Sequence, residues 1–244
     1  MKIVAIIEAR MSSTRLPGKI MRPILGRPML GLLIERVSAA DQVDQVVVAT
    51  TTNPADDRIE TLAGTLGVGC YRGSEEDVLN RVLEAAHAFS ADLIVEVTGD
   101  CPLIDPAVID TVISAYHAHD CDYASNILRR TFPRGMDVQV FPTRVLGEVA
   151  DLTRDPVDHE HVSLYIYEHP ERFLLWNVES SLDPSWWDLR LTVDTPEDFQ
   201  LIEEIFTRLY PGKRLFSLQD VIHLLTKYPR LREINAHIDQ KRVR

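Results

Sequence analysis

Two kinds of hydrophobic pattern alternate along the first half of the chain. Short apolar runs rich in β-branched residues are typical of buried strands, and they lie at 2–8, 45–50, 69–72 and 92–98. Between these runs, apolar positions at helical spacing and Pro or Gly boundary signals predict helices at 28–40, 54–66, 75–89 and 106–119. This alternation is typical of βαβ units, so we expect an α/β fold with a mixed, mainly parallel sheet flanked by helices.

The second half of the chain does not keep this alternation. A region rich in Arg and Pro surrounds a short predicted strand at 137–141. Further elements are predicted as strands near 172–178 and at 189–193, and as helices near 156–168, at 195–209 and, as a short pair, within 217–235. Because the chain contains no repeat and no flexible linker, we expect one domain over 1–244 with an inserted arm at about 127–180.

The composition limits the partners that the chain can have. Its 244 residues suffice for one or two domains, and 45% of them are hydrophobic, enough for a sizeable core. The net charge of −11 argues against nucleic acid or an acidic membrane as a partner, because both bind basic surfaces. The longest apolar run, 3–7, is too short to span a bilayer, no stretch resembles a cleavable signal, and the three cysteines form no CxxC pair. We therefore expect a soluble, cytoplasmic protein.

The segment after the first predicted strand, residues 9–19, carries the strongest chemical signal. It combines three cations, three hydroxyl groups and a glycine, namely Arg10, Arg15, Lys19, Ser12, Ser13, Thr14 and Gly18. Such groups bind polyphosphate, and ligands of open α/β sheets bind at the carboxyl ends of the strands. The segment is neither a Walker A loop nor a GxGxxG motif. A solvated basic loop is the alternative on composition alone, but the position after the first strand favours phosphate binding.

Two aspartates lie where strands are predicted to end. Asp100 follows the most strand-like segment, and Asp194 follows the strand predicted at 189–193. Thr195 and Asp198 have the spacing of a capping box for the next helix, which leaves Asp194 without that role. Each aspartate taken alone is better explained as a turn residue. Together, beside a cationic loop, they predict a metal–triphosphate site, since Mg²⁺ favours one or two carboxylates with phosphate oxygens.

These motifs are similar to those of a known enzyme family. The chain resembles the cytidylyltransferases that make CMP-activated acidic sugars, the CMP-Kdo synthetases and the acylneuraminate cytidylyltransferases. Within that family it is most similar to the branch of spore-coat polysaccharide proteins of the SpsF type. The matching stretches follow the family order and lie at 9–19, 73–81, 99–103, 160–165 and 193–198.

The resemblance implies a fold, an activity and an assembly. The fold would be that of the nucleotide-diphospho-sugar transferases, which is Rossmann-like, and the inserted arm would reach across the partner in a homodimer. The activity would be Mg²⁺-dependent transfer of CMP from CTP to an acidic sugar similar to Kdo or a nonulosonate. Pyrophosphate would be released, and the product would serve cell-surface polysaccharide biosynthesis.

The same resemblance assigns candidate site residues. Arg10, Lys19 and Asp100 would be catalytic, with Arg10 and Lys19 offsetting charge on the leaving pyrophosphate. Asp100 and Asp194 would be the metal ligands. The residues expected at the sugar are His161 and Tyr165. The residues expected at the nucleotide are Ala9, Arg10, Met11, Ser12, Ser13, Arg15, Lys19, Asp77, Arg81 and Asp100.

The sequence departs from the CMP-Kdo synthetase pattern on the sugar side. Thr98 and Cys101 replace a Gln and a Glu of those enzymes, and 186–190 occupies the region of their Glu-Gln-Leu-Arg segment. The acceptor therefore stays open, as do a nucleotidyltransferase with another nucleotide or acceptor and a nucleotide-binding protein without catalysis. No side chain is clearly a general base. Three arginines of the arm could steer an acidic sugar or form salt bridges, and the sequence favours neither use: Arg129, Arg130 and Arg134.

Overall fold

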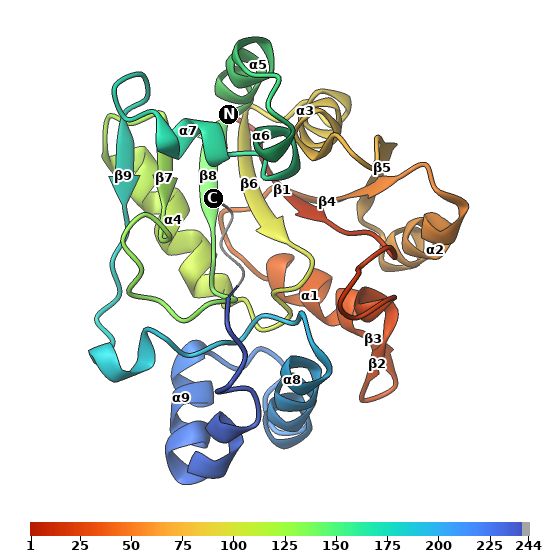
Figure 1. Cartoon of the computed structure of the whole chain (residues 1–244), viewed down its shortest axis with the longest axis vertical. Coiled ribbons are helices and arrows are strands. Elements are labelled where there is room, and N and C mark those ends of the chain that lie inside the picture. The colour runs from red at the N-terminus through yellow and green to blue at the C-terminus, as the bar shows by residue number, and fades with distance from the viewer. Residues whose placement is uncertain (241–244) are drawn as a thin grey trace.

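The computed structural model describes residues 1–240, and in them a seven-stranded sheet has the order β5-β4-β1-β6-β8-β7-β9 (Figure 1). Within this sheet, neighbouring strands run parallel to each other except at β8, which is antiparallel to both β6 and β7. The strands are β1 (Ile3–Glu8), β4 (Gln45–Thr51), β5 (Gly69–Gly73), β6 (Leu93–Thr98), β7 (Tyr123–Ser125), β8 (Gln139–Pro142) and β9 (Leu175–Asn177). The predicted α/β fold with a mainly parallel sheet is confirmed.

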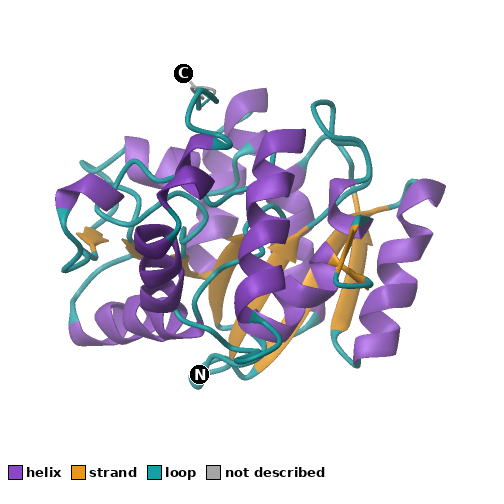
Figure 2. Ribbon diagram, turned by 90° about the horizontal axis from the view of Figure 1, so that it is seen from below, coloured by secondary structure: helices purple, strands orange, loops and turns teal. Residues whose placement is uncertain are grey.

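Helices lie among and around the strands, as Figure 2 shows. Those of the first half are α1 (Met29–Val37), α2 (Asp57–Leu66), α3 (Val78–Ala88) and α4 (Pro106–Ala118). Those of the second half are α5 (Thr143–Leu152), α6 (Pro156–Glu160), α7 (Leu164–Glu168), α8 (Pro196–Leu209) and α9 (Leu218–Lys227). Four 3₁₀ turns join them, η1 (Lys19–Met21), η2 (Pro54–Asp56), η3 (Pro184–Trp186) and η4 (Pro229–Glu233) within residues 1–240.

The sheet is buried on both faces, which explains why its strands read as continuous apolar runs. In β1, Ala5 and Ile7 pack with α1, α4, α8 and α9 in one hydrophobic cluster. Val4 and Ile6, which alternate with them, pack with α3, α5 and α7 in a second cluster. The first-half strands and helices therefore form close to the predicted boundaries. Two helix starts differ from the prediction by three residues: α2 begins at Asp57, after the 3₁₀ turn η2, and α3 begins at Val78, with Asp77 as its N-cap.

The helix predicted near 156–168 is wrong as a single helix. It is broken into α6 and α7 at Val162, whose φ of 46° lies in the left-handed region. A β-branched residue adopts that conformation only where its surroundings enforce it. The Val162 side chain is fully buried in the cluster beneath α3, and this burial fixes the turn of the chain.

The strand predicted at 189–193 is also wrong. Its alternating residues Leu189, Leu191 and Val193 are buried, but the segment makes only an isolated bridge between Arg190 and Arg134. Its backbone bonds to loops instead, with Leu191 N donating to Arg134 O at 2.8 Å and Val193 N donating to Asp100 O at 2.8 Å. The alternation of apolar and polar residues therefore arises without a strand, and Arg190 and Thr192 between the apolar residues are buried as well.

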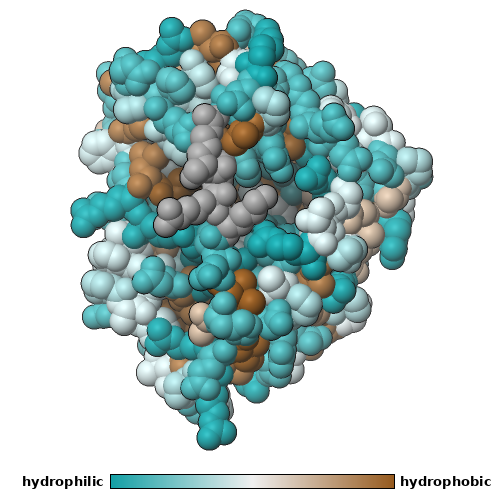
Figure 3. Space-filling model, viewed as in Figure 1, coloured by the Kyte–Doolittle hydropathy of each residue, from teal (hydrophilic) through white to brown (hydrophobic). Residues whose placement is uncertain are grey.

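Several short elements were not predicted, namely β7, α5 and the antiparallel pair β2 (Pro23–Ile24) and β3 (Arg27–Pro28). The face of the molecule seen in Figure 3 is mostly hydrophilic, with apolar side chains in small patches. Within residues 1–240, no helix combines the length and the hydrophobicity that a membrane span needs.

Candidate active site

Three loops meet at the carboxyl end of the sheet, around the ammonium group of Lys19. Lys19 follows β1, Asp100 follows β6, and Asp194 precedes α8. The Lys19 Nζ atom lies 3.0 Å from Asp194 Oδ1 and 3.5 Å from Asp100 Oδ2, and it donates to the Val193 carbonyl at 2.6 Å. The structure therefore brings together a cation and two carboxylates that are far apart in the sequence.

Asp194 is held by cations on both of its oxygens. Arg15 Nη2 lies 2.9 Å from Asp194 Oδ1, and Arg190 Nη2 lies 2.7 Å from Oδ2. Burial raises the pKa of Asp194, but Lys19 and Arg15 outweigh burial, so the pKa lies below its usual value. Burial by itself would lower the pKa of Lys19. The negative charges of Asp100 and Asp194 outweigh this effect of burial, so the pKa of Lys19 lies above its usual value. Both groups are therefore ionised at neutral pH.

Asp100 is positioned by the tight turn after β6. Thr98 Oγ1 donates to Asp100 Oδ1 at 2.7 Å, and Gly99 N donates to the carbonyl of Glu8 at 2.9 Å. A Cβ atom on Gly99 would lie 2.6 Å from that carbonyl oxygen, so only glycine lets β1 and the turn approach this closely. The Asp100 side chain stays 25% exposed, which leaves it accessible to a ligand.

The loop 9–19 is fixed to the sheet at its start and to neighbouring loops along its length. Ala9 is buried and bonds to β4, and the Met11 amide donates to Asp56 Oδ1 at 2.8 Å. The loop closes on itself through Gly18, whose amide donates to the Met11 carbonyl at 3.1 Å and whose φ is +66°. Ser12 and Arg15 stay exposed and Ser13 partly exposed, so hydroxyl and guanidinium groups remain accessible.

Arg10 and Ser12 point to a second cluster at the start of α3, away from Lys19. Arg10 Nη1 donates to the Glu75 carbonyl at 3.1 Å, and Ser12 Oγ donates to Glu75 Oε1 at 2.5 Å. Arg81 belongs to this cluster and is almost fully buried, with its guanidinium on the Ser74 carbonyl. Its burial lowers its pKa below the usual value.

Asp77 caps α3 and also reaches α6. Its Oδ1 accepts from Asn80 N at 3.0 Å and lies 2.8 Å from His159 Nδ1. Burial lowers the pKa of His159, but the hydrogen bond to Asp77 outweighs it, so that pKa is raised. Asp77 and His159 line a cavity of about 640 Å³ between α3, α5 and α6. Asp77 therefore has a structural role as a cap beside a space that a ligand could enter.

A model of the cytidylyltransferase family matches residues 4–227. This chain belongs to that family. The enzyme class predicted from the sequence, a CTP-dependent nucleotidyltransferase, is confirmed with it.

Relatives and solved structures agree with this assignment. The chain is 35% identical to the spore coat polysaccharide biosynthesis protein SpsF of Bacillus subtilis, over 93% of this chain and 95% of that protein. It is 33% identical to a 3-deoxy-manno-octulosonate cytidylyltransferase of Geobacter metallireducens, over 68% and 75% of the two chains. A solved cytidylyltransferase from Leptospira borgpetersenii superposes with a TM-score of 0.89 at 36% identity, over 95% of this chain and 96% of that one. The predicted resemblance, including the SpsF-like branch, is confirmed.

In this cytidylyltransferase, the two candidate sugar residues lie on either side of the break at Val162. His161 is the exposed C-cap of α6, whereas Tyr165 is half-buried on α7 and stacks on His169 with ring centroids 3.8 Å apart. Because α6 and α7 are separate helices, these two residues do not share one helical face. Their expected role at the sugar stays a prediction.

The donor set of the cluster fits a hard divalent cation. Asp100 and Asp194 converge on one cation, the Lys19 ammonium, and both ligating groups are carboxylate oxygens. Within residues 1–240 no group of three or more His, Cys, Asp or Glu side chains could hold a metal by itself. Two carboxylates completed by phosphate oxygens and water are the usual ligands of Mg²⁺ in nucleotide sites.

Sequence analysis did not identify three features of the cytidylyltransferase, of which a pair of buried glutamates is the first. Glu8 of β1 and Glu96 of β6 face each other beneath the site, and each has a buried oxygen that meets no donor within residues 1–240. Burial raises the pKa of Glu8 to about 7, partly opposed by Arg81, and burial and Glu8 raise that of Glu96 well above its usual value. A charged residue inside each of two apolar strands was the available signal. The other two features are the Asp77–His159 pair and Arg190.

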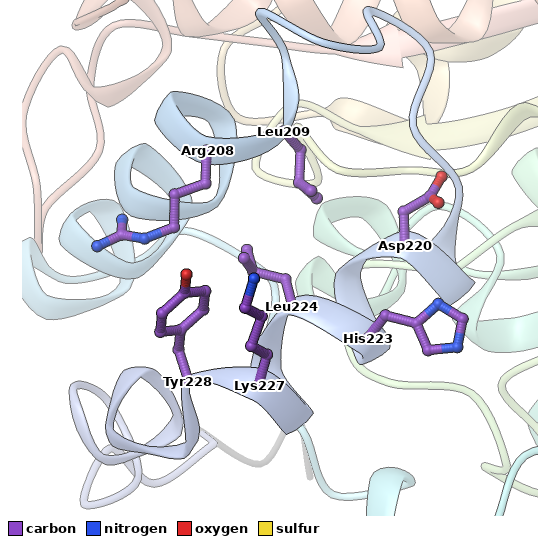
Figure 4. A pocket seen from close by; sticks show the side chains of 7 residues that line it. All are labelled: Arg208, Leu209, Asp220, His223, Leu224, Lys227 and Tyr228. Atoms are coloured by element: carbon purple, nitrogen blue, oxygen red, sulfur yellow. The ribbon is translucent and has the colours of Figure 1, made fainter.

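A second cavity, of about 450 Å³, lies between α8 and α9 and is lined by Arg208, Leu209, Asp220, His223, Leu224, Lys227 and Tyr228 (Figure 4). None of its lining residues belongs to the candidate site. Asp220 pairs with Lys213 at 2.7 Å and Arg208 pairs with Glu204, so its charges are used locally. We assign no role in the reaction to this cavity.

Proposed function

We propose that this cytidylyltransferase transfers CMP from CTP to a hydroxyl group of an acidic sugar, with release of pyrophosphate. The observation that carries the proposal is the cluster of Lys19, Asp100 and Asp194 at the carboxyl end of the sheet. It offers a cation for phosphate oxygens and two carboxylates for Mg²⁺ in the place where α/β sheets bind ligands. Its membership of the cytidylyltransferase family supports CTP as the nucleotide.

The residues of the chain have distinct parts in this reaction. Lys19 and Arg15 bind oxygens of the triphosphate and offset the charge that builds on the leaving pyrophosphate. Arg10, with Ser12 and Ser13, extends this binding along the loop. Asp100 and Asp194 hold Mg²⁺, which when bound polarises the phosphoryl oxygens and acidifies the attacking hydroxyl. Positioning and electrostatics then account for catalysis without a dedicated general base.

The nucleoside and the acceptor would lie on the side of α3, α6 and α7. Asp77 and Arg81 shape the nucleotide pocket from the start of α3, and Ala9 and Met11 border it from the loop. His161 and Tyr165 line the acceptor. A Kdo-like or nonulosonate-like acceptor is supported by the activity for which the Geobacter metallireducens relative is named, and a place in cell-surface polysaccharide synthesis by the name of SpsF.

We further propose that the chain is a homodimer in the cytoplasm, with residues 1–244 as one domain and 127–180 as the arm between subunits. Trp176 on edge strand β9 and Leu174 directly before that strand have exposed apolar side chains, which supports an interface there. The three free cysteines fit a reducing compartment.

The test is pyrophosphate release from CTP, in the presence of Mg²⁺, with a panel of acceptors. The panel contains Kdo, N-acetylneuraminate and, as the contrasting class, the 1-phosphate of a sugar that has no carboxylate. We expect release with CTP and a carboxylated sugar, and little with UTP, ATP or GTP. Release only with another nucleotide or with a sugar phosphate would replace this function by a different nucleotidyl transfer. Nucleotide binding without release from any acceptor would indicate a binding protein.

A further inference from the structure

The two oxygens of the Asp194 carboxylate have different partners. Its Oδ1 faces the site, where Lys19 and Arg15 approach it at 3.0 and 2.9 Å. Its Oδ2 faces away and is bound by Arg190 Nη2 at 2.7 Å. Because a carboxylate turns about its side-chain bonds, the group that holds Oδ2 decides where Oδ1 points.

Arg190 is itself fixed by a buried carboxylate. Its side chain is only 6% exposed, and its Nε and Nη2 atoms donate to Asp198 Oδ1 and Oδ2 at 2.9 and 3.1 Å. Asp198 is fully buried on α8, and its Oδ2 also accepts from the Asp194 amide at 2.9 Å. The planar fork of a guanidinium matches such a carboxylate in two bonds, which an ammonium cannot do.

A segment near the C-terminus completes this network. Asn235, which follows η4 and is 3% exposed, donates to Asp198 Oδ1 at 2.8 Å and to the Arg190 carbonyl at 3.1 Å. Arg190 Nη1 in addition donates to Gln240 Oε1. The segment after α9 is thereby connected to Asp194 through two buried polar side chains.

We propose that Arg190 is a positioning residue for Asp194, and that it acts together with Asp198 and Asn235 to aim Oδ1 at the metal and nucleotide. The inference rests on the proposed function, in which Asp194 is a metal ligand. A role in stability alone is a weaker explanation, since buried ion pairs lose much of their gain to desolvation. Buried groups that orient a metal ligand commonly change metal affinity when they are removed.

The test uses Mn²⁺ as the probe, titrated by electron paramagnetic resonance in the presence of CTP. We expect Arg190→Met to weaken Mn²⁺ binding about tenfold or more, and Arg190→Lys to restore part of it, because lysine keeps the charge without the fork. The matched control is Arg130→Met, since Arg130 also makes two bonds to one carboxylate, that of Asp137 at 2.6 and 3.1 Å, but does not touch Asp194. We expect the control to bind Mn²⁺ as the wild type does.

Asn235→Ala tests the same inference without removing a charge, in case Arg190→Met does not fold. The substitution deletes two hydrogen bonds of the network. We expect Mn²⁺ affinity to fall about two- to fivefold, a smaller effect because Asn235 contacts Arg190 and Asp198 but not Asp194 itself. Unchanged Mn²⁺ affinity in the folded variants, with only a lower melting temperature, would overturn the positioning role and leave the proposed function in place. Absence of Mn²⁺ and CTP binding in the wild type would instead overturn both.

Discussion

Two pairs of carboxylates lie near the carboxyl ends of the central strands, and their surroundings are opposite. Asp100 and Asp194 lie among Lys19, Arg15 and Arg190, and the cations lower the pKa of Asp194 against the effect of burial. Glu8 and Glu96, directly beneath, face each other in a buried position, and burial raises the pKa of both. Asp194 is therefore ionised, and the first pair, which lies among cations and is open to a ligand through Asp100, suits a metal ion.

The second pair keeps a proton at neutral pH, because one protonated carboxyl can donate to the other while two ionised ones repel. Residue type alone does not separate these roles, since all four groups are carboxyls near the same strand ends. The neighbouring cations and the access to solvent decide which pair serves the ligand. Substitutions in each pair should accordingly affect different measurements.

The largest effect is expected from Asp100→Asn. The substitution keeps the shape and the hydrogen bond from Thr98 but removes the charge that faces the metal. Turnover, measured as pyrophosphate release with the acceptor found in the panel, should fall about 10²–10³-fold, because metal assistance contributes several kcal/mol. The melting temperature should stay near that of the wild type. A fully active Asp100→Asn enzyme would contradict the metal assignment.

The next effect is expected from Lys19→Met. Loss of a charged donor to phosphate costs about 1.5–3 kcal/mol, so CTP should bind about 10–100-fold more weakly in a calorimetric titration. Arg129→Met is the control, because Arg129 is an exposed arginine that pairs with Glu179 and lies outside the cluster. Equal CTP affinity in Lys19→Met and the wild type would show that Lys19 is only the counter-ion of the two aspartates.

A third prediction concerns the turn that links the two pairs. Gly99→Ala would place a Cβ atom 2.6 Å from the Glu8 carbonyl oxygen, so β1 and the Asp100 turn must separate. We expect a loss of about 1–3 kcal/mol in the free energy of unfolding, measured in urea, together with weaker metal binding. Gly64→Ala in α2 is the matched control, since nothing lies within 4 Å of its added Cβ, and it should be neutral or slightly stabilising. Equal stability of the two variants would contradict the close approach.

The smallest effect is expected from Glu8→Gln, and it depends on pH. The pKa of Glu8 is raised to about 7 in the folded chain, so its protonated form is favoured by folding. The stability that this protonated form contributes is present in full below the pKa of Glu8 in the unfolded chain, about 4.5. It is lost as the pH rises to the folded-state pKa of about 7. The wild type should therefore lose stability between pH 5 and 8.

Glu8→Gln should lose less stability over the same interval, because its amide donates to Glu96 at every pH. The measurement is the melting temperature of both proteins across the interval. His159, whose raised pKa also gives stability that falls with rising pH, is present in both proteins and cancels in the difference. Parallel pH curves would contradict a shared proton.

The sequence was sufficient for the parts of the fold and site that depend on local pattern. Strands β1, β4 and β6 are apolar on both faces, and the loop 9–19 carries its cations within eleven residues, so both could be recognised directly. The break at Val162 could not be predicted, because the burial of the Val162 side chain against distant elements, not a local glycine or proline, enforces it. The segment 189–193 was mistaken for a strand because its apolar and polar residues alternate, although all five are buried and the segment makes only an isolated bridge.

Among the site residues, the sequence indicated which side chains have suitable chemistry but not which ones meet. Lys19 and Arg15 meet the aspartates, whereas Arg10 turns to the start of α3 instead. Arg190 showed no signal of its own, since its importance comes from Asp198 and Asn235, which lie on other parts of the fold. Long-range partners of this kind become visible only once the chain is folded.

Binding of CTP with Mg²⁺ by the cluster of Lys19, Asp100 and Asp194 can be measured by thermal unfolding with CTP, UTP, ATP and GTP, each with and without Mg²⁺. A ligand at a hundred times its dissociation constant adds about 2.7 kcal/mol to the free energy of unfolding, which raises the melting temperature by several degrees in a chain of this size. We predict the largest rise with CTP and Mg²⁺ together. A larger rise with another nucleotide, or no rise with any of the four, would show that this cluster is not a CTP site.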